Sequence, residues 1–124
     1  MKDHSLADWL ERIERLHAKP IDLGLERVRA VAERLDLRLP IAIVVGGTNG
    51  KGSCVSMLEA FLRRRSLKVG CYTSPHLQRY NERIRVNGTD STDAEIVAAF
   101  ERVEAARKGV PLTYFEFGTL ASLC

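Results

Sequence analysis

The stretch Val44-Val45-Gly46-Gly47-Thr48-Asn49-Gly50-Lys51-Gly52-Ser53 decides how the rest of the chain is interpreted. It continues the β-branched segment 41–45, a pattern typical of a strand buried on both faces of a parallel sheet. Its four glycines let backbone N–H groups converge on an anion, and a helix expected from near Ser53 adds the positive end of its dipole. Lys51 can then reach β- and γ-phosphates, and the Ser53 hydroxyl can approach Mg²⁺. The stretch therefore predicts a phosphate-binding loop.

The loop departs from the strict phosphate-loop pattern G-x-x-x-x-G-K-[ST]. With Gly50-Lys51 fixed, Val45 occupies the first glycine position, and Gly52 separates Lys51 from Ser53. Two interpretations remain open, a variant phosphate loop and a plain glycine-rich turn with Lys51 on its surface. The strand pattern before the loop and the helix pattern after it favour the phosphate loop.

Outward from the loop, the sequence predicts an α/β chain. Segment 68–72 predicts a second strand, so that strand, loop, helix and strand form a βαβ unit with two parallel strands and a right-handed crossover. Segment 83–86 alternates polar and apolar residues and ends at Asn87-Gly88, which favours a hairpin. The predicted fold is thus a partial P-loop-type parallel sheet flanked by helices.

Apolar residues at helical spacing predict helices on both sides of this unit. Ser5 with Asp8 and Thr113 with Glu116 form capping-box patterns at two helix starts. Trp9 lies on the apolar side of the first helix and is expected in the core. The helices are expected over about 6–17, 25–35, 92–108 and from 113 onward.

The composition is that of one modest globular domain. The chain has 124 residues, 45% of them hydrophobic and 28% charged, with a formal net charge of +3. This charge is too small to predict nucleic-acid binding. Three cysteines without a C-x-x-C pair indicate reduced thiols and a cytoplasmic location. No signal-peptide pattern is present, and the longest apolar run is too short to cross a membrane.

Five ordered blocks of the sequence carry a resemblance to a known family. The loop Gly47–Ser53 resembles the nucleotide loop of the Mur-ligase superfamily, and its G-K-G-S ending resembles the folate branch, folylpolyglutamate synthase and the bifunctional dihydrofolate synthase. Tyr72–Leu77 is similar to the branch's Y-[ST]-S-P-H-L, and Arg79–Val86 to its R-[FY]-x-E-R-[IV]-R-V. Segments 21–28 and 112–120 match two more blocks. The resemblance therefore covers nearly the whole chain.

The resemblance implies an ATP-dependent ligase of folate biosynthesis, with ATP and Mg²⁺ as cofactors. ATP phosphorylates a carboxylate of dihydropteroate or of a folate, and the amine of L-glutamate then attacks the acyl phosphate to give an amide. The charge on the transferring phosphoryl group must be neutralised during this reaction. The resemblance also implies a monomeric cytoplasmic parent enzyme that uses neither nucleic acid nor a membrane.

The resemblance also assigns site residues. Lys51 takes the catalytic role, and Ser74 together with Ser53 matches the Mg²⁺-binding positions. From the residues alone, Ser74-Pro75 is only a turn. His76 beside it is a weak metal-ligand candidate because it has no partner at ligand spacing. The positions that match ATP-phosphate binding are Thr48, Asn49, Gly50, Lys51, Gly52 and Ser53.

Two blocks match the family's pterin-substrate positions. From the residues alone, Asp22 is a helix N-cap and Thr113 with Glu116 is a capping box with aromatic packing beside it. An aromatic or apolar wall can also stack a flat heterocycle, so both roles can coexist. The matching residues are Asp22, Leu23, Gly24 and Leu25 in the first block and Thr113, Tyr114, Phe115 and Glu116 in the second.

We expect residues 1–124 to be the N-terminal part of a truncated ATP-binding ligase domain, because the helix from Thr113 has no end signal before Cys124. The family's other Mg²⁺ ligands, a glutamate and a histidine, and its C-terminal glutamate-ligase domain lie beyond the matched segment. We therefore expect no ligase activity from this chain alone, and marginal stability or self-association from its open sheet edge. The alternatives are a stand-alone nucleotide-binding or regulatory module and, less favoured, a kinase-like or GTPase-like protein.

Overall fold

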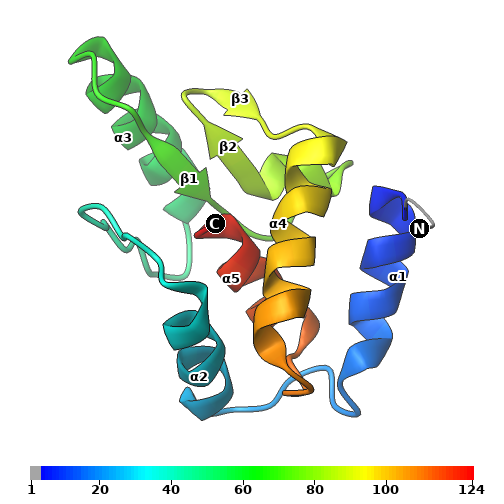
Figure 1. The fold of residues 1–124 in the computed structure, drawn as a ribbon. Coiled ribbons are helices and arrows are strands. Elements are labelled where there is room, and N and C mark those ends of the chain that lie inside the picture. Colours follow the sequence, from blue (N-terminus) through cyan, green and yellow to red (C-terminus); the bar gives the residue numbers. More distant parts are fainter. Residues whose placement is uncertain (1–3) are drawn as a thin grey trace. The chain divides into compact units, whose positions relative to one another are not determined.

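The computed structural model describes residues 4–124, which fall into two compact units (Figure 1). The helical unit comprises 4–39 and 93–124, and the sheet unit comprises 40–92. The helical unit contains α1 (Leu6–Leu16), α2 (Glu26–Leu35), α4 (Asp93–Arg107) and α5 (Tyr114–Ser122). The sheet unit contains α3 (Lys51–Arg64), β1 (Gly70–Tyr72), the 3-10 helix η1 (Tyr80–Arg83), β2 (Ile84–Val86) and β3 (Thr89–Asp90).

In the helical unit, α4 contacts each of the other three helices. Its buried face meets an aromatic cluster, in which the rings of Phe100 and Phe117 lie edge to face with centroids 5.5 Å apart. The ring of Trp9 lies 6.0 Å from Phe100 and 6.3 Å from Phe117. Such aromatic contacts stabilise a core beyond the area they bury. The prediction that Trp9 belongs to the core is confirmed.

Two predicted capping boxes are confirmed, and one predicted cap is wrong. The Asp8 N–H donates to Ser5 Oγ at 3.2 Å, and the Glu116 N–H donates to Thr113 Oγ1 at 3.2 Å. The N-cap of α2 is Leu25, without a side-chain cap, rather than the predicted Asp22. The reason is that the Asp22 carboxylate is turned toward charged neighbours, described below.

The sheet of the sheet unit is small and antiparallel, in the order β1-β2-β3. Gly70 pairs with Val86 and Tyr72 with Ile84. The predicted hairpin is confirmed, because Asn87 and Gly88 connect β2 to β3 with φ of 51° and 80°. Positive φ at both central residues matches the twist of the flanking strands.

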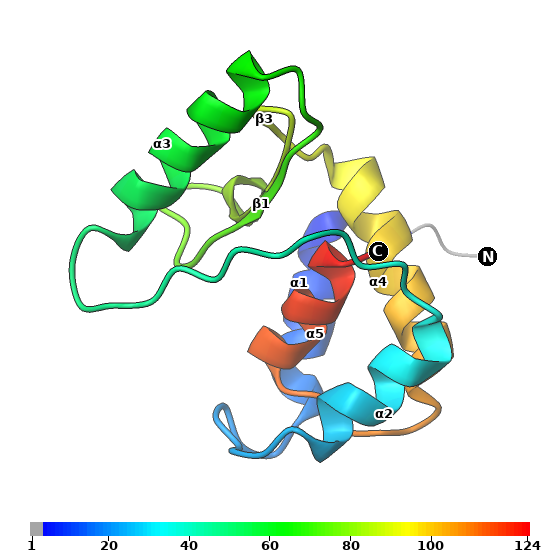
Figure 2. The same ribbon diagram turned by 90° about the vertical axis from the view of Figure 1, so that its left-hand side faces the viewer.

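The predicted strand over 41–45 and its parallel pairing are wrong for the part of the chain that the structure describes. Ile41 is 95% exposed and Val44 is 92% exposed, and no described strand pairs with this segment. Figure 2 draws it as a cyan-to-teal trace without an arrow, leading toward α3. A strand requires a partner edge for its backbone groups, and β1 pairs with β2 instead. The α/β class is therefore confirmed, whereas the sheet that is present is antiparallel.

The helix after the glycine loop is confirmed, although it begins at Lys51 rather than near Ser53. None of the helices formed by residues 4–124 combines the length and apolar character needed to cross a membrane.

Candidate nucleotide and substrate sites

The glycine loop leads directly into the start of α3. Gly50 is the N-cap of this helix and has φ of 80°, which only glycine adopts easily. No side chain caps the first N–H groups of α3. A Cβ placed on Gly47, Gly50 or Gly52 would meet no other heavy atom within 4 Å. The loop therefore presents uncapped N–H groups at an open helix start, which suits an anion.

The side chain of Lys51 folds back over the loop that precedes it. Its ammonium group donates hydrogen bonds to the carbonyl of Gly47 and, at 3.3 Å, to the carbonyl of Thr48. The whole run from Thr48 to Ser53 is exposed. The six predicted phosphate-binding residues therefore lie on one exposed turn, and the ammonium group of Lys51 lies over it.

Ser74, the other predicted Mg²⁺ ligand, lies in the loop that follows β1 and is exposed. The Ser74-Pro75 peptide bond is cis. Over residues 4–124, no group of three or more His, Cys, Asp or Glu side chains is placed to hold a metal ion.

The segment after Ser74 is held by polar contacts. The Glu82 carboxylate accepts from the N–H groups of Leu77, Gln78 and Arg79 at 2.9, 2.9 and 2.7 Å. These bonds to the charged form hold the pKa of Glu82 below its usual range. Arg83 Nε donates to His76 Nδ1 at 2.8 Å, so a neutral His76 ring carries its proton on Nε2 and has no free lone pair for a metal ion.

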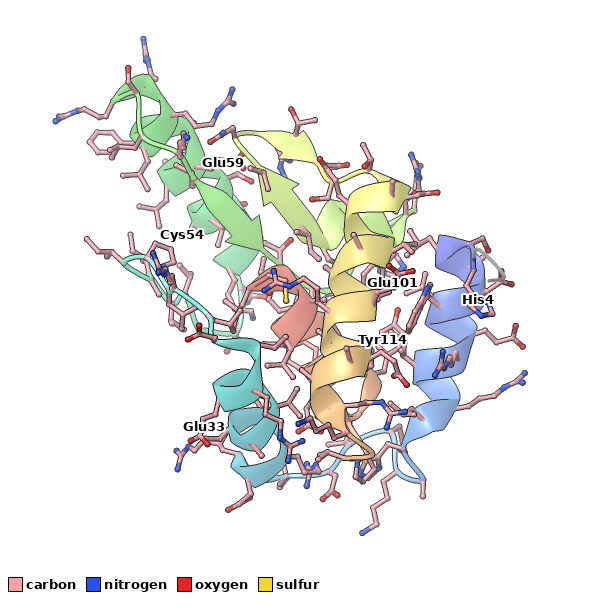
Figure 3. The ribbon with its side chains drawn as sticks, in the orientation of Figure 1. His4, Glu33, Cys54, Glu59, Glu101 and Tyr114 are labelled. Atoms are coloured by element: carbon pink, nitrogen blue, oxygen red, sulfur yellow. The ribbon has the colours of Figure 1, made fainter. Side chains whose placement is uncertain are left out.

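The arginines of the hairpin segment are engaged within the sheet unit. Arg85 pairs with Glu59 on α3 at 3.1 Å and lies 3.9 Å from Asp90. Figure 3 labels Glu59 and Cys54 on α3. Burial, with the nearby Glu59 as hydrogen-bond partner and negative charge, raises the pKa of the Cys71 thiol to about 11. Arg83 and Arg85 thus have protein partners within the sheet unit.

In the helical unit, the structure brings the two predicted substrate blocks together through Arg27. Arg27 Nη2 donates to the Asp22 carbonyl at 2.8 Å, and Nη1 lies 3.3 Å from Asp22 Oδ2. On its other side, Arg27 Nε and Nη2 contact the Glu116 carboxylate at 3.3 Å. His17 Nε2 lies 3.2 Å from Asp22 Oδ2. One guanidinium therefore links segment 22–25 to the start of α5.

The eight predicted substrate residues divide by exposure. Thr113 and Glu116 are buried, and Asp22 is half-buried. Leu23 is 88% exposed, Leu25 67% and Phe115 51%. The polar residues of the two blocks thus face the protein, whereas apolar ones remain available to a ligand.

A hollow of about 410 Å³ lies beside the second substrate block. Its wall includes Tyr114 and Phe115 from α5 and His17 and Pro20 from the end of α1 and the following loop. Tyr114 is labelled in Figure 3 at the start of α5. The first block contributes no side chain to this wall.

Sequence reasoning assigned no role to Arg27 or His17. The available signal was weak: Arg27 lies in the first turn of a helix, close in sequence to the acidic Asp22. Its second partner, Glu116, is 89 residues away, and no local pattern indicates a pair so distant.

The fold and these sites define an α/β chain that has an open glycine loop at a helix start and a separate hollow. The wall of the hollow combines Tyr114 and Phe115 with charged residues such as Glu11 and Glu14 of α1. A search against protein-family models finds no match. The chain is 51% identical over 120 residues to the dihydrofolate synthase/folylpolyglutamate synthase of Haemophilus influenzae, a match that covers 95% of this chain and 27% of the relative.

Solved structures of such enzymes are similar to this chain. The structure of Escherichia coli FolC in complex with DHPP and ADP matches with a TM-score of 0.94 and 50% identity, over 98% of this chain and 30% of that one. A bifunctional folylpolyglutamate synthase/dihydrofolate synthase with Mn, AMPPNP and L-glutamate bound matches with a TM-score of 0.89 and 50% identity, over 98% of this chain and 30% of that one. These matches confirm the resemblance to the folylpolyglutamate synthase and bifunctional dihydrofolate synthase family. The chain spans less than a third of the length of these relatives.

Proposed function

We propose that this chain forms part of the ATP-binding domain of an enzyme that ligates L-glutamate to dihydropteroate or to a folate through an acyl phosphate. The observation that carries the proposal is 51% identity over 95% of the chain to an enzyme named for both activities. We further propose that the complete ligase acts as a cytoplasmic monomer without nucleic acid or membrane.

The glycine loop supplies the nucleotide site in this proposal. The N–H groups at the start of α3 bind phosphate oxygens, and the Lys51 ammonium moves from the carbonyls of Gly47 and Thr48 onto the β- and γ-phosphates. Thr48, Asn49, Gly50 and Gly52 shape the turn. Lys51 then holds positive charge where negative charge develops on the transferring phosphoryl group, which is its catalytic role.

Ser53 and Ser74 are the proposed protein ligands of Mg²⁺. Hydroxyl oxygens are hard ligands that suit this ion, and both side chains are exposed. Two neutral oxygens hold Mg²⁺ only together with phosphate oxygens and water, an arrangement common for this cation. When bound, Mg²⁺ neutralises phosphate charge.

Segments 22–25 and 113–116 supply the pterin site in this proposal. The exposed apolar side chains of the two blocks offer contacts to a flat heterocycle, and the hollow beside Tyr114 and Phe115 has room for one.

The test is a hybrid enzyme in which this chain replaces the matching segment of the Haemophilus influenzae relative. We expect the hybrid to form dihydrofolate only when dihydropteroate, ATP, Mg²⁺ and L-glutamate are all present. Lys51→Ala should lower kcat by roughly a hundredfold or more, since it removes a charge that stabilises the transition state. Lys68→Ala, which removes an exposed lysine outside the loop, is the matched control and should leave kcat unchanged.

The isolated 124-residue chain completes the test. We expect it to release no phosphate from ATP with either pterin substrate and L-glutamate. Ligase activity of the isolated chain contradicts the part of the proposal that assigns catalysis to the longer enzyme. A hybrid that melts like its parent yet is inactive, while the isolated chain binds ADP, supports a nucleotide-binding module without catalysis.

A further inference from the structure

We propose that Arg27 is a positioning residue that fixes the turn 22–25 against the first turn of α5, and that the carboxylates of Asp22 and Glu116 serve Arg27 rather than the ligand. The proposal rests on the proposed function in that it takes these two segments as the pterin site. It assigns a role to a side chain outside both segments.

The geometry at Arg27 joins the two segments directly. The guanidinium contacts the backbone and the side chain of Asp22, at 2.8 and 3.3 Å, and reaches both oxygens of Glu116 at 3.3 Å. A planar guanidinium with five donors can satisfy two partners on different sides at once. Lysine, with a single ammonium group, cannot reproduce this fork. The contact is therefore specific to arginine.

The burial of the contact makes it stronger than a surface ion pair. The side chains of Arg27 and Glu116 are 19% and 11% exposed. Exposed ion pairs contribute little, whereas a buried charge that loses its partner is costly. Without Arg27, the carboxylates of Asp22 and Glu116 would lose the positive charge that both of them contact, so the two segments would separate.

The carboxylates of Asp22 and Glu116 both have hydrogen-bond or ion-pair partners within the protein. Glu116 Oε1 accepts the N–H of Thr113 at 3.0 Å, which closes the capping box of α5. Asp22 Oδ2 also faces His17 Nε2, and His17 Nδ1 accepts the N–H of Lys19 at 2.9 Å. Each acidic group thus has partners from two directions. The side chains that remain exposed in the two segments are chiefly apolar, and apolar side chains suit the flat face of a heterocycle better than its hydrogen-bonding edge.

The experiment measures two affinities of the full 124-residue chain. Dihydropteroate, followed by its own fluorescence, reports on the helical unit, and ADP with Mg²⁺, followed by calorimetry, reports on the glycine loop. We expect Arg27→Gln to weaken dihydropteroate binding roughly tenfold, because the arrangement of the two segments that binds the ligand loses one charged hydrogen-bonded contact within the protein. Its affinity for ADP should stay unchanged. Arg27→Lys should recover only part of the loss, because it restores charge without the fork.

Two further variants separate positioning from direct contact. Arg29→Gln removes the same charge from an exposed position of the same helix and should change neither affinity. Glu116→Gln should weaken dihydropteroate binding. The double variant with Arg27→Gln should bind dihydropteroate no more weakly than the single variant that has the lower affinity, because both substitutions remove the same contact. Additive losses, an equal loss in Arg29→Gln, or unchanged binding in Arg27→Gln would overturn the proposal.

Hydrogen exchange decides the proposal independently of the ligand. In Arg27→Gln, amides of 21–25 and 113–116 should exchange faster, while those in the middle of α4 should not. If the unsubstituted chain fails to bind dihydropteroate, the assignment of the pterin site to this chain fails. The exchange result then still supports or overturns the role of Arg27. If Arg27→Gln does not fold, Arg27→Lys provides the same comparison.

Discussion

The helical unit and the sheet unit differ in how they bury apolar side chains. The helical unit contains a full core, with Phe100, Phe117 and Leu112 completely buried. In the described sheet unit, Tyr80 is the only buried apolar side chain, and α3 buries only Glu59. Its large exposed apolar residues are Ile41, Ile43, Val44, Met57, Phe61, Leu67, Leu77 and Val86.

This difference shows that the two candidate sites rest on different kinds of support. The candidate substrate segments are joined by a partly buried ion-pair network, and the second of them begins the helix that carries Phe117 of the aromatic core. The glycine loop and Ser74 lie in a unit held mainly by backbone pairing and polar contacts. Exposed apolar surface of this extent marks an interaction site or an aggregation hazard. The sheet unit therefore leaves more large apolar side chains uncovered than the helical unit does.

The largest expected effect contrasts two phenylalanines. Phe100→Ala should lower the free energy of unfolding of the helical unit by about 3–5 kcal/mol, because it leaves a cavity in a packed core. Phe61→Ala, on the exposed face of α3, should change the stability of the sheet unit by less than about 0.5 kcal/mol. Urea unfolding followed by Trp9 fluorescence for the helical unit, and by hydrogen exchange for both units, measures the two effects. A comparable loss for Phe61→Ala would contradict the contrast between the units.

The predictions from the sequence were correct where the signal lies in neighbouring residues. Helices with strong apolar periodicity and capping boxes, such as α1 and α5, were predicted because their signals are local. The hairpin at Asn87-Gly88 was predicted for the same reason. The strand over 41–45 was not correct, because a strand exists only when a second strand pairs with it, and the sequence of one segment does not show its partner.

The candidate sites divide in a similar way. The glycine loop could be identified from consecutive residues, since its chemistry depends on neighbours in sequence. The role of Arg27 could not, because its two partners are far apart in the chain and only the packed helices bring them together. Asp22 illustrates the same limit: its position favoured an N-cap, but Arg27 and His17 supply partners that the local pattern did not show.

A smaller effect is expected for two cysteines of the sheet unit. Cys54 is exposed on α3 (Figure 3), whereas Cys71 is half-buried beside Glu59, with its pKa raised to about 11. Since the thiolate is the nucleophile and burial raises the pKa of Cys71, iodoacetamide at pH 8 should modify Cys71 far more slowly than the exposed Cys54. Mass spectrometry of tryptic peptides over time measures both rates. In denaturant the rates should converge, and equal rates in the folded chain would show that even this part of the sheet unit is open to solvent.

The smallest effect concerns the polar support of the segment after Ser74. Because the pKa of Glu82 is held below its usual range by three N–H donors, its stabilising contribution is complete above the ordinary glutamate pKa and is lost as the pH falls through the lowered value. The amide signals of Leu77, Gln78 and Arg79 should therefore titrate together in acid when followed by NMR. Glu82→Gln should abolish this titration, whereas Glu101→Gln, at an exposed position on α4, should leave it unchanged. A titration that survives in Glu82→Gln would mean that another group controls this segment, and that its order does not come from the polar contacts that distinguish the sheet unit.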